Sequence, residues 1–468
     1  MPDERRILTV ATATATARLG RIGTTSRRCP AASSPHPALA PSTDKPEPSA
    51  RSALQGKTDL CVQCGLCLPH CPTYALYRIE GESPRGRLAL IQGALTGALH
   101  ADARLSALLD HCLSCQACEA VCPSRVPFGE IMDEARAMLE PARHRTPAAR
   151  LLRRGLLDGL VPHGAALRLA GRLLRVYQRS GLQAVARRGG LLGARRLADA
   201  EALLPPLAPV RRWRSRYAAQ PPHRGVVALF IGCVASVADR PNLEAAVRVL
   251  TRLGFEVRIP RNQTCCGALH RHEAAPEAER RLARRNLEAF GDSDVPIVSL
   301  ASGCCAQLVR YGTLLATPGG AAFATRVYDI NRFLVESPWP ADAQPAPLRA
   351  RVAVHEPCTL RNALHGQDKP YRLLERIPGL DVVPLGGGAH CCGAAGAHLL
   401  HYAEDARRLR EPKLQAVHAL RPRFVVTSNI GCALHLAAGL RSDPQAPEVL
   451  HPVTLLDRQL RAGATRSD

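Results

Sequence analysis

Short apolar runs alternate with amphipathic segments along the second half of the chain. The run GVVALFI at 225–231 is rich in β-branched residues, and a segment with helical periodicity follows it near 240–253. A second apolar run at 255–259, a helical segment near 274–290 and a third run at 295–300 continue the alternation. Strands that alternate with helices of this length predict a small parallel sheet with crossover helices.

This pattern occurs twice, in segments that also share their cysteines. Each copy opens with a β-branched run that ends in cysteine, passes through a Cys-Cys-Gly triplet and closes with an apolar strand that leads to a further cysteine. The paired landmarks are Cys233 and Cys358, Cys265 and Cys391, and Cys304 and Cys432, which are offset by 125, 126 and 128 residues. Such regular offsets predict a duplicated α/β domain, which we place at 223–340 (repeat 1) and at 341–468 (repeat 2, with a C-terminal helix).

The rest of the chain divides into three parts by composition. Residues 1–56 are rich in Ala, Thr, Ser and Pro and are predicted to form a disordered tail, in which Cys29 is an incidental thiol. Residues 57–140 hold two dense cysteine runs, and residues 141–222 form an Arg/Leu/Ala-rich helical region that ends in a proline-rich linker. No apolar stretch reaches the ~18 residues of a bilayer-spanning helix.

The two cysteine runs give the most specific chemical signal. CVQCGLCLPHCP begins at Cys61 and CLSCQACEAVCP at Cys112, and both follow the spacing CxxCxxCxxxCP. In this spacing three thiolates ligate one 4Fe-4S cluster, and the fourth, held before proline, ligates the cluster of the other run. The predicted ligands are Cys61, Cys64, Cys67 and Cys122 for the first cluster, and Cys112, Cys115, Cys118 and Cys71 for the second. Zinc is the main alternative, but a zinc site needs only two CxxC pairs.

A helical insert is predicted between the two runs. Ser83 is suited to cap this helix, and Pro84 to occupy its first position. Arg85 and Arg87 lie at its start, where they either donate hydrogen bonds toward cluster sulfurs or a partner's carboxylates, or are simply solvated.

The chemistry of the two Cys-Cys-Gly units is more open. Repeat 1 supplies Cys233, Cys265, Cys266 and Cys304, and repeat 2 supplies Cys358, Cys391, Cys392 and Cys432. Four thiolates can hold a cubane, a 2Fe-2S centre or a zinc ion, and adjacent cysteines can also form a redox-active dithiol. Cys305 has no counterpart in repeat 2 and is interpreted as a spare. The nearby histidines are interpreted as lining a polar pocket rather than as ligands or proton carriers: His270, His272, His355, His390 and His398.

The chain is strongly basic, with a net charge of +22 from 62 basic and 40 acidic residues. The arginines are spread along the whole chain, aromatic residues make up only 4%, and no motif interleaves base-stacking residues with them. We therefore expect no nucleic-acid partner. A surface that meets anionic lipid or an acidic partner accounts better for the charge.

These motifs together resemble the iron-sulfur subunit family of glycolate oxidase (glycolate dehydrogenase). The resemblance covers about residues 57–460 and rests on motifs that occur in the family's order: CVQCGLCLPHCPTYALYRIEGESPRGRLALI, HCLSCQACEAVCPSRVPFGEI, CCGALHRH, SGCCAQLVRYG, CCGAAG and TSNIGC. It implies a helical two-cluster ferredoxin-like domain followed by a duplicated small α/β domain, an α+β and α/β architecture.

The resemblance also implies a division of labour between subunits. A partner subunit carries FAD and oxidises glycolate to glyoxylate, and electrons leave through the two 4Fe-4S clusters of this chain toward the quinone pool. The complex is then peripheral on the inner, cytoplasmic face of the cell membrane. In agreement with this division, the sequence offers no catalytic residue set of its own. No GxGxxG motif follows a strand, and Gly386 to Gly388 are interpreted as a flexible loop.

Three alternatives remain at the level of sequence. One is a lactate-utilisation iron-sulfur subunit, and another is a heterodisulfide-reductase-like oxidoreductase that acts at the Cys-Cys-Gly units. In the heterodisulfide reductases each unit ends in CxxC, but here Ala301 and Asn429 replace the first cysteine of that pair. This replacement disfavours disulfide-reducing chemistry. The third is a zinc scaffold that binds nucleic acid.

Overall fold

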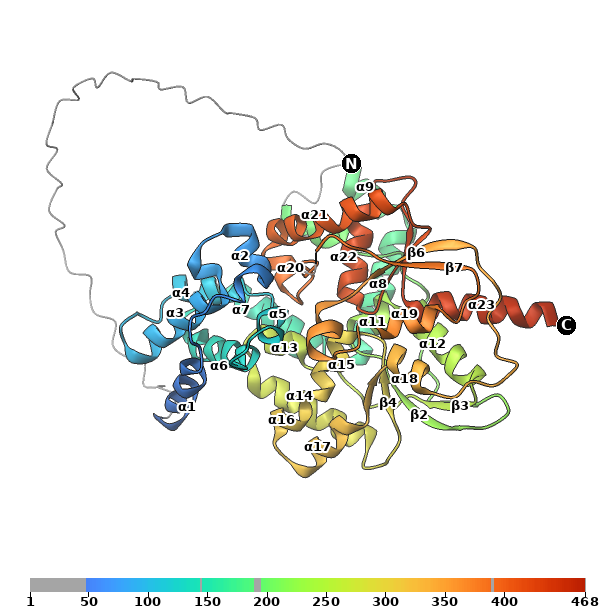
Figure 1. Ribbon diagram of the computed structural model, residues 1–468, viewed down its shortest axis with the longest axis horizontal. Coiled ribbons are helices and arrows are strands. Elements are labelled where there is room, and N and C mark those ends of the chain that lie inside the picture. Colours follow the sequence, from blue (N-terminus) through green and yellow to red (C-terminus); the bar gives the residue numbers. More distant parts are fainter. Residues whose placement is uncertain (1–47, 144, 189–194, 389–390, 468) are drawn as a thin grey trace, which may run out of the picture. The chain divides into compact units, whose positions relative to one another are not determined.

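The N-terminal part of the structure is a helical domain that carries the two cysteine runs (Figure 1). The computed structural model describes residues 48–143, 145–188, 195–388 and 391–467. The α-helices of this part are α1 (Pro48–Asp59), α2 (Pro72–Tyr77), α3 (Pro84–Thr96), α4 (Ala103–Asp110), α5 (Ala117–Ala120) and α6 (Phe128–Leu139). Short 3-10 turns are η1 (Leu68–His70), η2 (Glu80–Glu82) and η3 (Glu140–Ala142). One apolar core joins α1, α3, α4 and α6 through Leu54, Ile91, Leu109 and Ile131.

Helix α1 corrects one predicted boundary. The disordered tail was predicted to extend to residue 56, but the chain is helical from Pro48. The reason is tertiary packing, because Leu54 is buried in the core and Nζ of Lys57 lies 2.7 Å from a carboxylate oxygen of Glu134 on α6. Residues 1–47, with Cys29, lie outside the described residues. The insert helix is confirmed as α3, since Oγ of Ser83 accepts a hydrogen bond from the backbone N–H of Gly86 at 2.9 Å.

A set of helices connects this domain to the sheets. They are α7 (Pro147–Arg154), the π-helix η4 (Gly155–Leu160), α8 (Gly164–Arg179), α9 (Leu182–Arg188) and α10 (Arg195–Ala202). Helix α8 packs through Gly171, where an added Cβ would lie 2.7 Å from Cγ1 of Val237. No helix within the described ranges is both long and apolar enough to cross a bilayer.

Repeat 1 forms a five-stranded sheet in the order β1-β3-β2-β4-β5. The strands are β1 (Arg216–Tyr217), β2 (Gly225–Phe230), β3 (Phe255–Arg258), β4 (Ile297–Ser299) and β5 (Val327–Asp329), and all pairs are parallel except β1 with β3. Its helices are α11 (Val234–Ala238), α12 (Arg240–Arg252), α13 (Ala268–His272), α14 (Pro276–Phe290), α15 (Ser302–Val309), α16 (Tyr311–Leu315), α17 (Pro318–Thr325) and α18 (Ile330–Glu336). The prediction of a parallel sheet with crossover helices is confirmed.

Repeat 2 has the same topology without the antiparallel edge. Its sheet runs β7-β6-β8-β9, and every pair is parallel. The strands are β6 (Ala350–His355), β7 (Leu380–Pro384), β8 (Phe424–Thr427) and β9 (Glu448–Leu450). Its helices are the π-helix η5 (Thr359–Ala363), α19 (Lys369–Leu374), α20 (His398–His401), α21 (Ala403–Leu420), α22 (Ile430–Leu440) and α23 (Pro452–Ser467).

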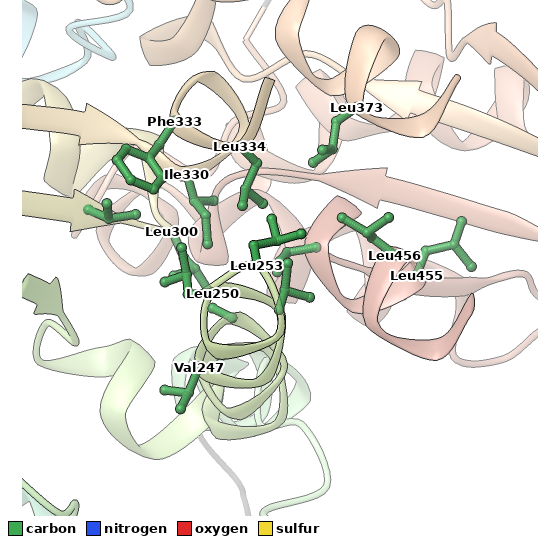
Figure 2. Packing of buried hydrophobic residues seen from close by; sticks show 14 of the residues in the cluster. Val247, Leu250, Leu253, Leu300, Ile330, Phe333, Leu334, Leu373, Leu455 and Leu456 are labelled. Carbon is green, nitrogen blue, oxygen red and sulfur yellow. The ribbon is translucent and has the colours of Figure 1, made fainter. Parts of the chain in front are cut away.

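The two repeats share one hydrophobic core and are not separate domains. Figure 2 shows Leu250 of α12 and Leu253, which directly follows that helix, beside Leu334 of α18, with Leu455 and Leu456 of α23 nearby. All five side chains are buried in one cluster. At the edge of this cluster an ion pair joins Arg248 of α12 to Asp457 of α23 at 2.8 Å. The C-terminal helix of repeat 2 is therefore held against repeat 1.

Candidate metal centres

Both cysteine runs fold into loops of the same shape. Gln63 and Gly65 in the first run have φ of 58° and 81°, and the corresponding Ser114 and Gln116 in the second have φ of 50° and 57°. Left-handed backbone costs roughly 1–2 kcal/mol at each residue other than glycine. Its occurrence at matching positions therefore indicates that both runs need the same tight loop. Turning the chain this tightly brings successive cysteines of each run toward one centre.

The fourth cysteine of the first run lies with the second run. Cys71 is buried and lines one small cavity together with Cys112, Cys115 and Cys118. Burial raises the pKa of the Cys115 and Cys118 thiols well above the usual value, so thiolates there require a nearby cation. Four sulfurs from both runs around an enclosed space fit the donor set of a 4Fe-4S cluster.

The other predicted set is more exposed. Cys61, Cys67 and Cys122 are partly buried against the core of the N-terminal helices, whereas Cys64 is exposed. Burial raises the pKa of the Cys67 thiol, although the backbone N–H of Arg85 donates to its sulfur and opposes the shift. The cluster that these residues are predicted to hold would therefore lie nearer the surface than the other one.

Two buried arginines stiffen the loops. Arg87, only 1% exposed, pairs with the carboxylate of Glu82 and donates to Oγ1 of Thr73 at 3.0 Å, and that hydroxyl lies 3.4 Å from Sγ of Cys71. Arg136 acts on the second run by donating to the carbonyl oxygen of Cys112. The sequence-based expectation for Arg87 was wrong, because its guanidinium is neither solvated nor aimed at a sulfur or a partner.

Arg85 is held at the protein surface. Its Nε lies 2.7 Å from Oε1 of Glu80, and its Nη1 donates to the carbonyl oxygen of Gln63 at 3.0 Å. The side chain thus braces the first cysteine loop through its backbone.

Repeat 1 gathers its four cysteines beyond the carboxyl end of β2. Sγ of Cys233 lies 3.5 Å from Sγ of Cys265, and Cys266 is within hydrogen-bonding range of both Cys265 and Cys304. Cys305 is buried in the apolar core of this repeat. Tight turning at the Cys-Cys-Gly unit uses Gly267, whose φ is 92°.

Aromatic and neutral polar side chains pack close to the cysteines of repeat 1. Phe230, the last residue of β2, packs against Phe290 with ring centroids 6.2 Å apart. Asn286 donates to the carbonyl oxygen of Cys265 at 3.0 Å, and the hydroxyl of Tyr311 donates to that of Cys266 at 2.8 Å.

A wide cavity of about 610 Å³ reaches the repeat 1 site from the side of α8. Cys233 and Cys265 form part of its wall. Five arginines also line it, and none of them has an ion pair among the described residues: Arg168, Arg211, Arg212, Arg214 and Arg261. The cavity is therefore strongly positive.

Repeat 2 gathers its cysteines in the same way. Sγ of Cys358 lies 3.9 Å from Sγ of Cys391, and Cys392 is within hydrogen-bonding range of Cys432. The ligand atoms of His355, Cys392 and Cys432 all lie within 4.8 Å of one another, and all three residues are buried. Asn429, which replaces a cysteine of the longer motif, donates to Sγ of Cys432 at 3.6 Å.

A buried lysine lies near this second site. Lys413 of α21 is 5% exposed, and its Nζ donates to the carbonyl oxygens of Gly386, at 2.9 Å, and Gly388. Burial lowers the pKa of Lys413, while the nearby Cys391 and Cys392 oppose that shift electrostatically. The loop at 386–388, which was interpreted from the sequence as flexible, therefore holds the ammonium group of Lys413 near the thiols of Cys391 and Cys392.

The sulfurs of repeat 2 lie next to the N-terminal domain. Cys115 packs in one cluster with Cys391 and Cys358, and Nδ2 of Asn362 donates to the carbonyl oxygen of Cys115 at 2.7 Å. Repeat 1 contacts the same domain through ion pairs of Arg271 and Arg310 with Asp133, at 2.5 and 2.9 Å, while its cysteines lie in a separate hydrophobic cluster. Sequence reasoning missed this asymmetry between the repeats.

Three further histidines that the sequence analysis singled out, His270, His272 and His398, lie in buried or partly buried positions. Nε2 of His270 lies 2.9 Å from the carbonyl oxygen of Leu157, while His272 and His398 line a cavity of about 360 Å³ beside Cys112. Burial lowers the pKa of both His272 and His398 to about 3, which keeps these rings neutral. His390 lies outside the described residues.

Comparisons with protein families agree with this arrangement. A 4Fe-4S dicluster domain profile matches residues 57–126, and a cysteine-rich domain profile matches twice, at 227–309 and 352–437. The profile of the linker region of the glycolate oxidase iron-sulfur subunit matches residues 148–204. The match at 57–126 implies two clusters in the N-terminal domain.

Two glycolate oxidase iron-sulfur subunits match most of the chain, and a lactate utilization protein matches about half of it. The probable glycolate oxidase iron-sulfur subunit of Bacillus subtilis (strain 168) is 32% identical over 425 residues, which are 88% of this chain and 96% of the relative. The glycolate oxidase iron-sulfur subunit of Escherichia coli (strain K12) is 31% identical over 413 residues, with coverage of 86% and 93%. Lactate utilization protein A of Shouchella clausii (strain KSM-K16) is 26% identical over 236 residues, 49% of this chain and 98% of that protein.

Proposed function

Because the chain belongs to the family of glycolate oxidase iron-sulfur subunits, we propose that it is the electron-transfer subunit of a glycolate (2-hydroxyacid) dehydrogenase complex. A partner subunit that binds FAD oxidises glycolate to glyoxylate, and the electrons pass through this chain toward the quinone pool. The observation that carries the proposal is the grouping of Cys71 with Cys112, Cys115 and Cys118 around one cavity.

Eight cysteines of the N-terminal domain would hold two 4Fe-4S clusters. Cys61, Cys64, Cys67 and Cys122 are the ligands of one, and Cys112, Cys115, Cys118 and Cys71 those of the other. When bound, such clusters accept and release single electrons at potentials set by the protein around them. We call the more buried set, Cys71, Cys112, Cys115 and Cys118, the inner site, and the cluster that it would hold the inner cluster. Arg87 and Arg136 hydrogen-bond to the cysteine loops, and the packing of Leu109 and Ile131 keeps water from the inner site.

The cysteines of the two repeats would hold a further iron-sulfur or zinc centre. Each repeat brings four cysteines together, three of them buried and the fourth, Cys304 or Cys358, partly buried, which supports a metal in preference to free thiols. Contact of Cys358 and Cys391 with Cys115 supports repeat 2 as the neighbour of the inner cluster.

We further propose that the complex lies on the inner, cytoplasmic face of the membrane. Leu169, Leu173 and Val176 form an exposed apolar stripe on α8, with exposures of 58%, 62% and 62%. Arg172 and Arg179 flank it on the same helix and are exposed. A basic amphipathic helix of this kind is suited to the surface of an anionic bilayer.

Vesicle binding tests the membrane proposal. The full chain should sediment with vesicles that contain phosphatidylglycerol and less with pure phosphatidylcholine. The substitution Leu173→Asp should reduce that binding several-fold, because it places a charge in the apolar stripe. Equal binding by the wild type and the variant would contradict this assignment.

The alternatives are less well supported. The lactate-utilisation relative covers only half of the chain, and the heterodisulfide-type motif lacks one cysteine in each repeat, at Ala301 and Asn429. A Cys392 variant that keeps its N-terminal clusters distinguishes between two roles of the chain, a self-contained reductase and an electron carrier. Unchanged dye-linked electron transfer would remove a catalytic role for the repeats.

Co-purification of the native complex without oxygen, followed by flavin and iron analysis, tests the central proposal. We expect FAD on a partner subunit and at least roughly eight irons on this chain, as two 4Fe-4S clusters require. Glycolate should bleach the flavin and then reduce the clusters. A complex without flavin, or a chain that holds zinc alone, would contradict the proposal.

A further inference from the structure

Repeat 2 carries a buried histidine beside its sulfurs where repeat 1 carries a phenylalanine. His355 and Phe230 are equivalent, since each is the last residue of the strand that leads to the first cysteine of its repeat (β6 and β2). Each stands three residues before that cysteine, Cys358 or Cys233. In repeat 2 the imidazole, Cys392 and Cys432 offer ligand atoms within 4.8 Å of one another. Phe230 offers none.

The ring of His355 is oriented by the neighbouring strand. Its Nδ1 lies 2.9 Å from Oγ1 of Thr427, which pairs with His355 in the register of β6 and β8. Metal-binding histidines commonly donate their other ring N–H to an oxygen acceptor of this kind, which fixes both the ring orientation and the tautomer. With Nδ1 engaged by the hydroxyl, Nε2 is the nitrogen available to a metal.

We propose that His355 is a metal ligand, so that repeat 2 holds an iron or zinc centre with mixed nitrogen and sulfur ligands while repeat 1 uses sulfur alone. Imidazole and thiolate are ligands that both metals accept. Cys392 and Cys432 are the sulfur ligands that share the metal with His355. The inference deepens the proposed function by naming the donor set of one repeat, but it does not depend on glycolate or on the two N-terminal clusters.

The surroundings support a filled site rather than a polar pocket. Lys413 places a cation near Cys391 and Cys392, which favours a centre whose thiolates carry net negative charge. The equivalent position in repeat 1 is Asn286. The glycine of each Cys-Cys-Gly unit packs on the following long helix, Gly267 on Glu279 of α14 and Gly393 on Ala406 of α21. Asn286 and Lys413 each lie seven residues after that contact, so they occupy equivalent positions. Repeat 2 has thus acquired both a ligand and a countercharge that repeat 1 lacks.

The test uses the full chain purified without oxygen as wild type, His355→Phe and His355→Cys. His355→Phe installs the residue of repeat 1, whereas His355→Cys keeps a ligand but removes the nitrogen. Iron and zinc per chain are measured by mass spectrometry, and the metal beyond the two N-terminal clusters is examined by X-ray absorption. We expect His355→Phe to weaken binding of that metal about tenfold or more. His355→Cys should restore it with one nitrogen scatterer fewer than the wild type.

Two controls separate ligation from folding. The electron paramagnetic resonance signals of the N-terminal clusters report whether each variant is folded. His418→Phe, which removes an exposed histidine near the end of α21 that is not among the ligand atoms grouped with His355, should retain the extra metal.

The outcomes distinguish this inference from the proposed function. A wild-type chain with both N-terminal clusters and no further metal overturns the inference alone. So does His355→Phe protein that keeps the wild-type metal content and nitrogen signal. A chain that lacks the N-terminal clusters but loses zinc on His355→Phe substitution overturns the proposed function and supports the inference.

Discussion

The two repeats place the same four cysteines on the same scaffold but surround them differently. In each, the first cysteine follows β2 or β6, and the Cys-Cys-Gly unit turns through a glycine with φ near 90°. The last cysteine lies in the helix after β4 or β8. Repeat 1 adds Phe230 and Asn286 and borders a cavity rich in arginine, whereas repeat 2 adds His355 and Lys413. Duplication preserved the geometry of the sulfurs while the groups that tune them diverged.

The two cysteine sites also differ in what lies next to them. Only the repeat 2 sulfurs pack against a cysteine of the described N-terminal domain, through Cys115, while Cys233 and Cys265 of repeat 1 border the open cavity. A site that adjoins an electron carrier benefits from a fixed charge and a defined ligand set. A site at an open cavity is accessible to a molecule that enters from the solvent.

A matched pair of cysteine substitutions should have the largest effect. Cys391→Ser and Cys265→Ser remove equivalent sulfurs, so each should lose the metal of its own repeat. Only Cys391→Ser should also alter the electron paramagnetic resonance spectrum of the inner N-terminal cluster, because Cys391 packs with Cys115. Equal effects of the two variants on that spectrum would remove the distinction between the repeats.

A buried histidine tests the shared core that joins the repeats. His451, at the start of α23, bonds through Nε2 to the carbonyl oxygen of Leu300 in repeat 1 at 3.1 Å, and burial lowers its pKa from 6.5 to about 4. The unfolded chain therefore binds this proton first, and stability is lost as the pH falls from 6.5 toward 4. The loss from this residue should be about 3 kcal/mol.

The measurement is the urea midpoint as a function of pH for wild type and His451→Gln. The variant should show a flatter profile over that pH window, since glutamine does not titrate. Substitution of the exposed His418 by Gln serves as the control for the loss of a histidine elsewhere in repeat 2. Parallel profiles for wild type and His451→Gln would mean that His451 is not neutral in the folded protein.

Removal of the buried cation should have a smaller effect on the repeat 2 site. Lys413→Met removes the positive charge, so the thiolates lose a favourable interaction and metal affinity should fall about tenfold, or ~1.4 kcal/mol. Chelator competition measures that affinity. Lys369→Met, which removes a lysine paired with Glu336 near the surface, is the matched control and should have no such effect.

Local patterns predicted the strands and the grouping of the cysteines, but not the interactions between distant segments. Apolar runs and cysteine spacing suffice for β2, β3, β4 and the cysteine sets, because those signals lie within a few residues of one another. The two-residue β1 lies in the segment predicted as linker and exists only through pairing with β3. A strand this short carries no periodicity of its own.

The buried charges show the same limit. Arg87 lies on the buried face of α3, four residues before Ile91, yet its burial depends on Glu82 and Thr73 beyond the helix. Lys413 depends on two glycine carbonyls, and the contact of Asn362 with Cys115 spans 247 positions. No local pattern encodes these pairings, so they follow only from the assembled fold.

The most direct test of the account is an electron paramagnetic resonance spectrum of the anaerobic, dithionite-reduced chain, with iron counted on the same sample. Two clusters with crossed ligands predict roughly eight irons in the N-terminal domain and the signal of reduced, magnetically interacting 4Fe-4S centres. A colourless chain that holds zinc and gives no such signal would contradict it.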